Sequence, residues 1–170
     1  FLSKDGIAVS AGGNVEDLTS RGYGTLKNKK LTLSFYEALF LQSKELLEVY
    51  EEGSHQALIF QELLHRFENV DENIWVRYLI YRDLRSRGYV VREGFGLGID
   101  FRVYERGEYG KATAAYLIRG IQEGKPTSVK ELAQVLKQVH SLKKKMVLAV
   151  INRRGEIVYY TISNLTMKKQ

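Results

Sequence analysis

A tyrosine and a run of lysines are the side chains of this sequence best suited to chemistry. Tyr104 ends the alternating segment 98–104 and precedes a glycine-containing turn, and Lys143-Lys144-Lys145 follows later in the chain. A phenol and ammonium groups without metal ligands suit RNA cleavage by the RNA's own 2′-hydroxyl. Such cleavage needs a base for the hydroxyl proton, an acid for the leaving oxygen and a cation for the phosphorane. No histidine lies near Thr113, in the segment that follows the turn.

The composition is that of a basic globular protein. Lys+Arg exceed Asp+Glu by 26 to 20, which gives a net charge of +6, and hydrophobic residues make up 44% of the 170 residues. The charge favours a polyanionic partner, although many basic proteins bind no nucleic acid, so both readings stay open. Cysteine is absent, which excludes disulfides and thiolate zinc sites. The absence of cysteine also fits the cytoplasmic location that we expect. We expect no membrane span, because no apolar run reaches eighteen residues.

The elements that must position these side chains fall into two parts, and we expect a mixed α+β fold. Residues 1–88 form a helical and strand-containing subdomain, and residues 89–170 form a mixed-sheet domain. In the first part we expect short strands near 7–9 and 24–26 and helices over 34–50, 55–67 and 72–87, with Ser34 and Glu37 as a capping box. In the second we expect a helix over 128–141 and strands over 89–94, 98–104, 114–119, 145–151 and 156–162.

Several segments match a known family in order and spacing. In the second half they are Leu84–Arg92, Gly98–Gly107, Tyr116–Ile118, Val139–Ser141 with Lys144, Leu148–Ile151 and Gly155–Tyr160. Arg21–Gly24 and Leu33–Leu41 extend the match into the first half. On these segments the chain resembles the archaeal tRNA-splicing endonuclease family. The resemblance implies a restriction-endonuclease-like C-terminal domain.

The resemblance also implies a reaction. The family cleaves precursor tRNA at bulge–helix–bulge sites without a metal or cofactor and leaves a 2′,3′-cyclic phosphate and a 5′-hydroxyl. It uses a tyrosine, a histidine and a lysine. Tyr104 matches the tyrosine and Lys144 the lysine, but Thr113 stands at the histidine position. Losing a positioned acid or base costs roughly 10²–10⁴ in rate.

Thr113 therefore leads us to expect a structural, non-catalytic subunit. Some members of the family are heterotetramers of two catalytic and two structural subunits, so the expected partners are a catalytic paralogue and precursor tRNA. An arginine of the family that holds a flipped-out base is matched by Lys137, and we expect Lys137, Lys143 and Lys145 to bind RNA.

The expected subunit interface rests on Glu123, Tyr159 and Tyr160. Glu123 lies where the family carries an acidic loop that enters a basic pocket of the opposite subunit. Tyr159 and Tyr160 belong to a final strand that is apolar on both faces, which suits pairing with a partner or an ordinary core.

Two alternatives remain. His140 is the nearest replacement for the missing histidine in a divergent active enzyme, although its place on an apolar helical stripe predicts a buried, hydrogen-bonded side chain. The chain could also be a stand-alone RNA-binding module.

Overall fold

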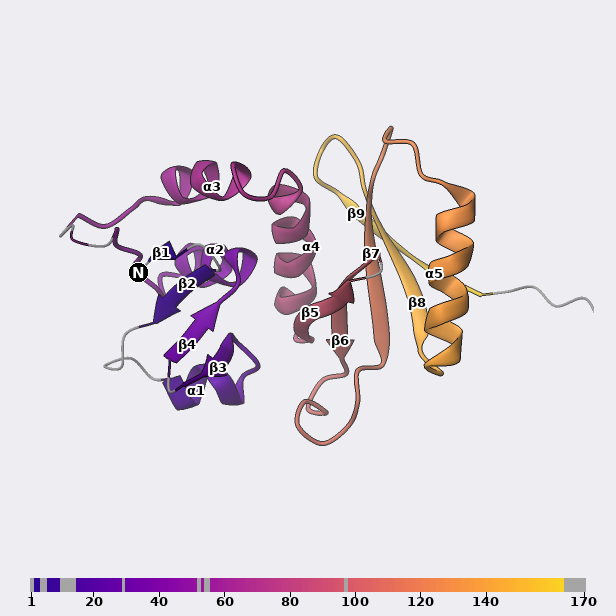
Figure 1. Cartoon of the computed structure of the whole chain (residues 1–170), viewed down its shortest axis with the longest axis horizontal. Helices are drawn as coiled ribbons and strands as arrows, with labels where there is room; N and C mark the ends of the chain where they lie inside the picture. The colour runs from indigo at the N-terminus through magenta and orange to yellow at the C-terminus, as the bar shows by residue number, and fades with distance from the viewer. Residues whose placement is uncertain are drawn as a thin grey trace, which may run out of the picture. The chain divides into compact units, whose positions relative to one another are not determined.

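The computed structural model describes residues 2–3, 6–9, 15–28, 30–51, 53, 56–96 and 98–163. The chain divides into two compact units, Phe1–Arg87 and Gly88–Gln170. Within the described residues, each unit contains one β-sheet; the N-terminal unit also has several helices, and the C-terminal unit has one helix (Figure 1). The mixed α+β class expected from the sequence is therefore confirmed.

The sheet of the N-terminal unit is antiparallel, with the strand order β1-β2-β4-β3. The expected strands near 7–9 and 24–26 are confirmed. Three short elements were not expected: a two-residue strand at Leu2–Ser3, a helix, and a strand whose Leu31 and Leu33 are fully buried. The elements of this part are β1 (Leu2–Ser3), β2 (Gly6–Val9), α1 (Val15–Ser20), β3 (Thr25–Lys27) and β4 (Lys30–Leu33).

Three longer helices complete this unit, namely α2 (Phe35–Ser43), α3 (Phe60–Glu68) and α4 (Ile74–Ser86). Aromatic side chains join α2 to α4. The ring centroids of Tyr36 and Phe40 lie 5.0 and 5.6 Å from that of Tyr81, which is fully buried. Such ring pairs stabilise a core beyond the apolar area that they bury.

Two of the expected helices are shorter than the sequence pattern indicates. The helix expected over 34–50 ends at Ser43, because Glu45 adopts a left-handed backbone (φ 58°) and the Leu46 N–H donates to the carbonyl of Leu41. Leu46 is consequently 58% exposed and does not join the core. The helix expected from residue 55 begins at Phe60; residues 54–55 lie outside the described part.

The expected pairing of Ser34 with Glu37 at the start of α2 is confirmed. The N–H and the hydroxyl of Ser34 both donate to one oxygen of the Glu37 carboxylate, each at 2.9 Å. The other oxygen accepts the Gly24 N–H at 3.1 Å. Glu37 is only 4% exposed. This buried carboxylate therefore ties the start of the helix to the segment before β3.

The sheet of the C-terminal unit is mixed, with its strands in chain order. All neighbours are antiparallel except β7 and β8, which are parallel. A parallel pair needs a crossover connection, and helix α5 (Val129–Ser141) provides it (Figure 1). The strands are β5 (Val90–Gly96), β6 (Ile99–Tyr104), β7 (Tyr116–Gln122), β8 (Lys145–Ile151) and β9 (Ile157–Ile162).

Helix α5 packs on one face of this sheet. As expected from the sequence, it begins after Ser128, whose hydroxyl oxygen accepts the Glu131 N–H at 3.3 Å. Its apolar stripe is buried against side chains of β6, β7 and β8, and burial of each such side chain contributes about 1.5–3 kcal/mol. The buried members of this core are Ile99, Leu117, Val135, Leu136, Val139, Met146 and Leu148.

Candidate functional site

Strand β6 places Tyr104 on the face of the sheet that α5 partly covers. Buried and half-buried residues alternate along the strand, so Arg102 and Tyr104 share a face. Arg102 is paired in register with Leu117, a member of the core beneath α5. Directly paired residues point to the same face, so Arg102 and Tyr104 lie beside the helix.

The loop between β6 and β7 carries Thr113. The loop folds on itself through backbone hydrogen bonds, and the Ala115 N–H donates to the carbonyl of Val103 at 2.9 Å. The hydroxyl of Tyr116 donates to the Glu105 carboxylate at 2.7 Å, which ties the two ends of the loop together. That hydrogen bond, with a smaller contribution from burial, raises the pKa of Tyr116. Thr113 itself is exposed at the end of the loop.

The turn between α5 and β8 positions Lys144. Lys143 adopts a left-handed backbone (φ 54°), as residues after a helix C-terminus commonly do. The Lys144 N–H then donates to the carbonyl of Val139 at 3.2 Å, which closes the end of the helix. Strand β8 starts at the next residue, and Lys145 is paired with Tyr116 of β7. Lys144 and Thr113 therefore lie at the same end of the parallel strand pair, next to the N-termini of β7 and β8.

These three positions meet at one open pocket of about 310 Å³. Tyr104, Thr113 and Lys144 all line it, together with residues from β5, β7 and the end of α5. The Lys144 ammonium donates a hydrogen bond to Thr113 Oγ1 at 2.5 Å. The Tyr104 ring also packs edge-on against Tyr109, at 5.1 Å between centroids. The structure thus brings together the three residues that the sequence singled out.

The pocket contains groups that can bind an anion, and a threonine at the position matched to the family's histidine. Lys144 has ammonium protons to offer to an anion, and one of them is directed to the threonine hydroxyl. A threonine hydroxyl does not ionise near neutral pH, unlike the imidazole of histidine, which titrates there. The pocket therefore offers a cation, a phenol and a neutral hydroxyl.

Among the pocket residues that were not predicted, one carries a charge and one an aromatic ring. The Arg102 guanidinium lies 4.7 Å from the ring centroid of Phe95, and its Nε donates to the carbonyl of Glu93 at 2.8 Å. Arg102 could have been found, because it lies two residues before Tyr104 and so on the same face. Phe95 could not, because a β-bulge between Glu93 and Gly96 sets its direction.

The other expected site residues are at the surface. Lys137, Lys143 and Lys145 are exposed, and the Lys145 ammonium lies 5.8 Å from the ring of Tyr116. The described lining of the pocket of Tyr104, Thr113 and Lys144 includes none of these three lysines. Glu123 is exposed in the turn after β7, and its N–H donates to the carbonyl of Ile151 at 2.8 Å.

Tyr159 and Tyr160 belong to β9, the last strand in the order of its sheet. Tyr159 is half-buried, whereas Tyr160 is 52% exposed and Val158 is 51% exposed. Exposed apolar side chains therefore do occur along this edge strand.

The expectation of a buried His140 is wrong, because the side chain is exposed. At 3.6 residues per turn, position 140 lies about 95° from the centre of the stripe formed by Val135, Leu136 and Val139. His140 is also absent from the described lining of the pocket. It is therefore not placed to act in place of a histidine at position 113.

Two general findings concern the described residues only. Across those ranges, no three His, Asp or Glu side chains cluster closely enough to hold a metal ion. Within the same part of the chain, no helix has the length and apolar character needed to cross a bilayer.

Comparisons with known proteins agree on one family. The family model described as tRNA intron endonuclease, catalytic C-terminal domain, matches residues 74–159, and its N-terminal domain model matches residues 1–63. A tRNA-splicing endonuclease of Methanococcus maripaludis is 34% identical over 98% of this chain and 93% of its own length. One from Pyrococcus furiosus is 36% identical over 84% of this chain and 81% of its own length.

Proposed function

Because this chain belongs to the tRNA intron endonuclease family, we propose that it is the structural, non-catalytic subunit of a tRNA-splicing endonuclease. In this role it binds precursor tRNA in the cytoplasm and holds a catalytic paralogue in place. The paralogue performs the cleavage that leaves a 2′,3′-cyclic phosphate and a 5′-hydroxyl.

The single observation that carries the proposal is the contact between Thr113 and Lys144. At the position that matches the family's histidine, the pocket has a hydroxyl that accepts a hydrogen bond from the lysine. This hydroxyl does not ionise near neutral pH, so it is a poor general acid or base. A pocket with Tyr104 and Lys144 but without this group retains phosphate binding and lacks one proton-transfer step of the reaction.

The cations around the pocket support a role in binding RNA. Arg102 and Lys144 line the pocket, and Lys143 and Lys145 flank Lys144 in the chain. Lys137 adds an exposed charge on α5. Phosphate contacts from such side chains supply most of the sequence-independent affinity for nucleic acid. The subunit would thus add RNA-binding surface to the complex.

The assembly that we propose is a heterotetramer of two catalytic and two structural subunits. Strand β9 is an edge strand with exposed Val158 and Tyr160, and such edges readily pair with another chain. Glu123, exposed in the turn after β7, is proposed to contact the opposite subunit. Light scattering on the mixture with the paralogue should give the mass of four chains.

The test is cleavage of a bulge–helix–bulge RNA. The isolated chain should not cleave it, and adding the paralogue should produce cleavage that disappears when the paralogue's own histidine is replaced by alanine. Lys144→Ala in this chain should leave the rate of chemistry in the complex unchanged. Cleavage by the isolated chain at the rate of the complex would refute the proposal.

A second candidate is a divergent enzyme in which this chain cleaves RNA itself. The convergence of Tyr104 and Lys144 on one pocket favours it. In that case Lys144→Ala would lower the rate of chemistry at saturating RNA even when the paralogue is intact. The same variant therefore separates the two functions.

A further inference from the structure

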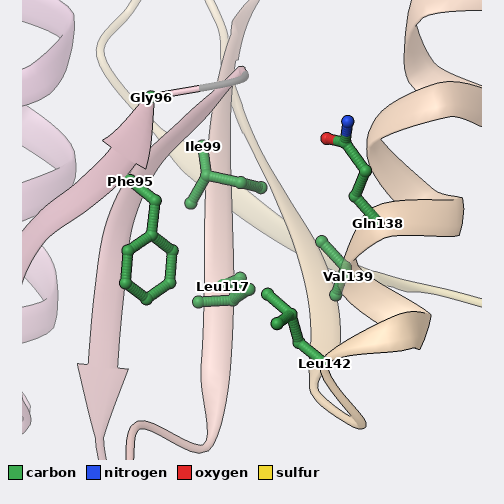
Figure 2. A pocket seen from close by; sticks show the side chains of 7 residues that line it. All are labelled: Phe95, Gly96, Ile99, Leu117, Gln138, Val139 and Leu142. Atoms are coloured by element: carbon green, nitrogen blue, oxygen red, sulfur yellow. The ribbon is translucent and has the colours of Figure 1, made fainter.

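The C-terminal unit has a second, apolar pocket of about 170 Å³ beside the one already described (Figure 2). Phe95 on β5, Leu117 on β7 and Leu142 at the end of α5 line both pockets, so the apolar pocket belongs to the same site. A separate surface lies on helix α4 of the N-terminal unit. The described lining of the two pockets includes none of its residues.

One side of α4 carries Trp75, Tyr78, Arg82 and Arg85, which recur at spacings of three and four residues. We call the surface formed by Trp75, Arg82 and Arg85 the arginine face. Trp75 is 41% exposed, whereas Tyr78 is buried. The rings of Trp75 and Phe60 pack on the ring of Tyr78, with centroids at 5.5 and 5.4 Å. An aromatic cluster therefore supports this face.

Both arginines of the face lie over buried tyrosine rings. The Arg85 guanidinium lies 3.8 Å from the centre of the Tyr23 ring, and it donates a hydrogen bond to the carbonyl of Arg21 at 3.0 Å. The Arg82 guanidinium lies 5.6 Å from the centre of the Tyr78 ring. A guanidinium that packs on a ring by its flat side keeps N–H donors at its edge for an anion. The two cations are thus oriented before a ligand binds.

The other arginines of this segment are paired with acids of the same unit. Arg77 contacts Asp71 at 3.0 Å, and Arg87 contacts Asp83 at 2.8 Å. Among the described residues, the two cations of the arginine face have no acidic partner. The face therefore carries two uncompensated positive charges within a small area, and this charge favours an anionic ligand.

The donors of the face fit the backbone of an RNA stem. Guanidinium groups bind phosphate oxygens through pairs of N–H donors. Arg82 and Arg85 are separated by about 4.5 Å along the helix axis, so they can contact neighbouring phosphates of one strand. The indole N–H of Trp75 is a further donor. Paired RNA presents phosphates and 2′-hydroxyls at its surface, and proteins recognise it mostly through these groups.

We propose that the arginine face binds the sugar–phosphate backbone of a paired RNA stem, apart from the site that contains Tyr104, Thr113 and Lys144. The proposal rests on the proposed function for its class of RNA substrate, and it gives the N-terminal unit a binding role of its own. Contacts with phosphates do not depend on sequence, and they weaken as salt is added. The face therefore adds affinity without selecting the splice site.

The test uses a fully paired RNA duplex as the probe, so that no bulge nucleotide is available to the pocket of the C-terminal unit. Trp75 is the only tryptophan of the sequence, so the tryptophan fluorescence of the full chain reports on the arginine face. Adding the duplex should change this fluorescence until the face is saturated, and added salt should reverse the change. Arg82→Ala should weaken binding and lower the slope of log affinity against log salt by about 1.

Matched variants make the result specific to this face. Arg66→Ala removes an arginine of α3 that is bound to Glu51 at 2.6 Å, so affinity and salt slope should stay unchanged. Arg82→Lys keeps the charge without the planar fork, so it should restore the salt slope but only part of the affinity. Arg82 is exposed, so its variants should fold, as circular dichroism would verify.

Three outcomes would overturn the proposal. They are no binding of the duplex, binding without a change in Trp75 fluorescence, and an Arg82→Ala salt slope equal to that of the unmodified chain. A change in Trp75 fluorescence on adding a tryptophan-free paralogue, but not on adding the duplex, would assign the face to a protein partner instead. Each of these results leaves the structural-subunit proposal standing, because that proposal is tested by cleavage. Cleavage by the isolated chain would in turn leave the stem contact standing.

Discussion

Replacing Thr113 by histidine should convert the binding pocket into a cleaving one. Thr113 is exposed at the edge of an open pocket of about 310 Å³, so an imidazole ring can be accommodated without displacing the core. The substitution removes the hydrogen bond from Lys144, and an ordinary hydrogen bond contributes about 0.5–1.5 kcal/mol to stability. The variant should therefore fold.

The expected gain follows from the missing proton transfer. A positioned acid or base contributes about 10²–10⁴ in rate, which corresponds to about 3–5 kcal/mol of the activation barrier. Thr113→His should raise cleavage by this chain by a factor in that range. Tyr104 and Lys144 already line the same pocket, so no further residue has to be supplied.

The assay is single-turnover cleavage of a bulge–helix–bulge RNA by a complex whose paralogous subunit has its histidine replaced by alanine. Only the variant chain can then cleave. Thr113→Ser keeps the hydroxyl and should remain inactive, and Thr113→His with Lys144→Ala should lose most of the gain. If Thr113→His folds and binds the RNA but cleaves no faster than the unmodified chain, the threonine is not the reason for inactivity.

Three further predictions concern the elements around the site. Gly94→Ala should lower the free energy of unfolding, measured in urea, by about 2 kcal/mol or more, because the added Cβ atom would lie 2.0 Å from the backbone. Gly107→Ala is the control: it has open space at φ 76° and should lower the free energy of unfolding by only about 1–2 kcal/mol. An equal loss for both variants would contradict the β-bulge at Gly94. Glu105→Gln should lower the pKa of Tyr116 towards its ordinary value near 10, seen by tyrosinate absorbance against the unmodified chain. Because the folded-state pKa is raised, this contact stabilises the fold below about pH 10, and its contribution is lost as pH rises through the folded-state pKa; an unchanged titration would refute the assignment. Lys143→Ala with Lys145→Ala should reduce the slope of log affinity for RNA against log salt by about 1–2, and an unchanged slope would show that neither lysine contacts phosphate.

Sequence periodicity predicted the elements that carry the site better than those of the N-terminal unit. The pattern of β6 and the stripe of α5 each extend over several repeats, so Tyr104 and Lys144 could be assigned to a strand end and a helix end. Strand β4 and helix α1 are too short to show a period, and neither was expected. The overlong helix over 34–50 arose because Leu46 fits a helical spacing, whereas the left-handed backbone at Glu45 ends that spacing.

The misjudged features of the site have a common physical origin. His140 lies at the margin of an apolar stripe, where spacing alone does not separate buried from exposed positions. Phe95 depends on a bulge, which shifts the alternation of a strand by one residue and has no periodic signal. Arg102 was within reach of the period-two pattern that identified Tyr104.

Thr113 and Lys144 are far apart in the sequence, and the parallel pairing of β7 with β8 brings them together. Both residues come just before paired strand starts, and Tyr116 faces Lys145 across that pair. The exposed turn over residues 123–127 lies at the opposite ends of these strands. If the chain were cut in this turn, β7 and β8 would lie on different fragments. Pairing of the two strands in the same register would still bring Lys144 next to Thr113. The site is thus suited to assembly from two separately expressed pieces, and to transfer of one half without the other.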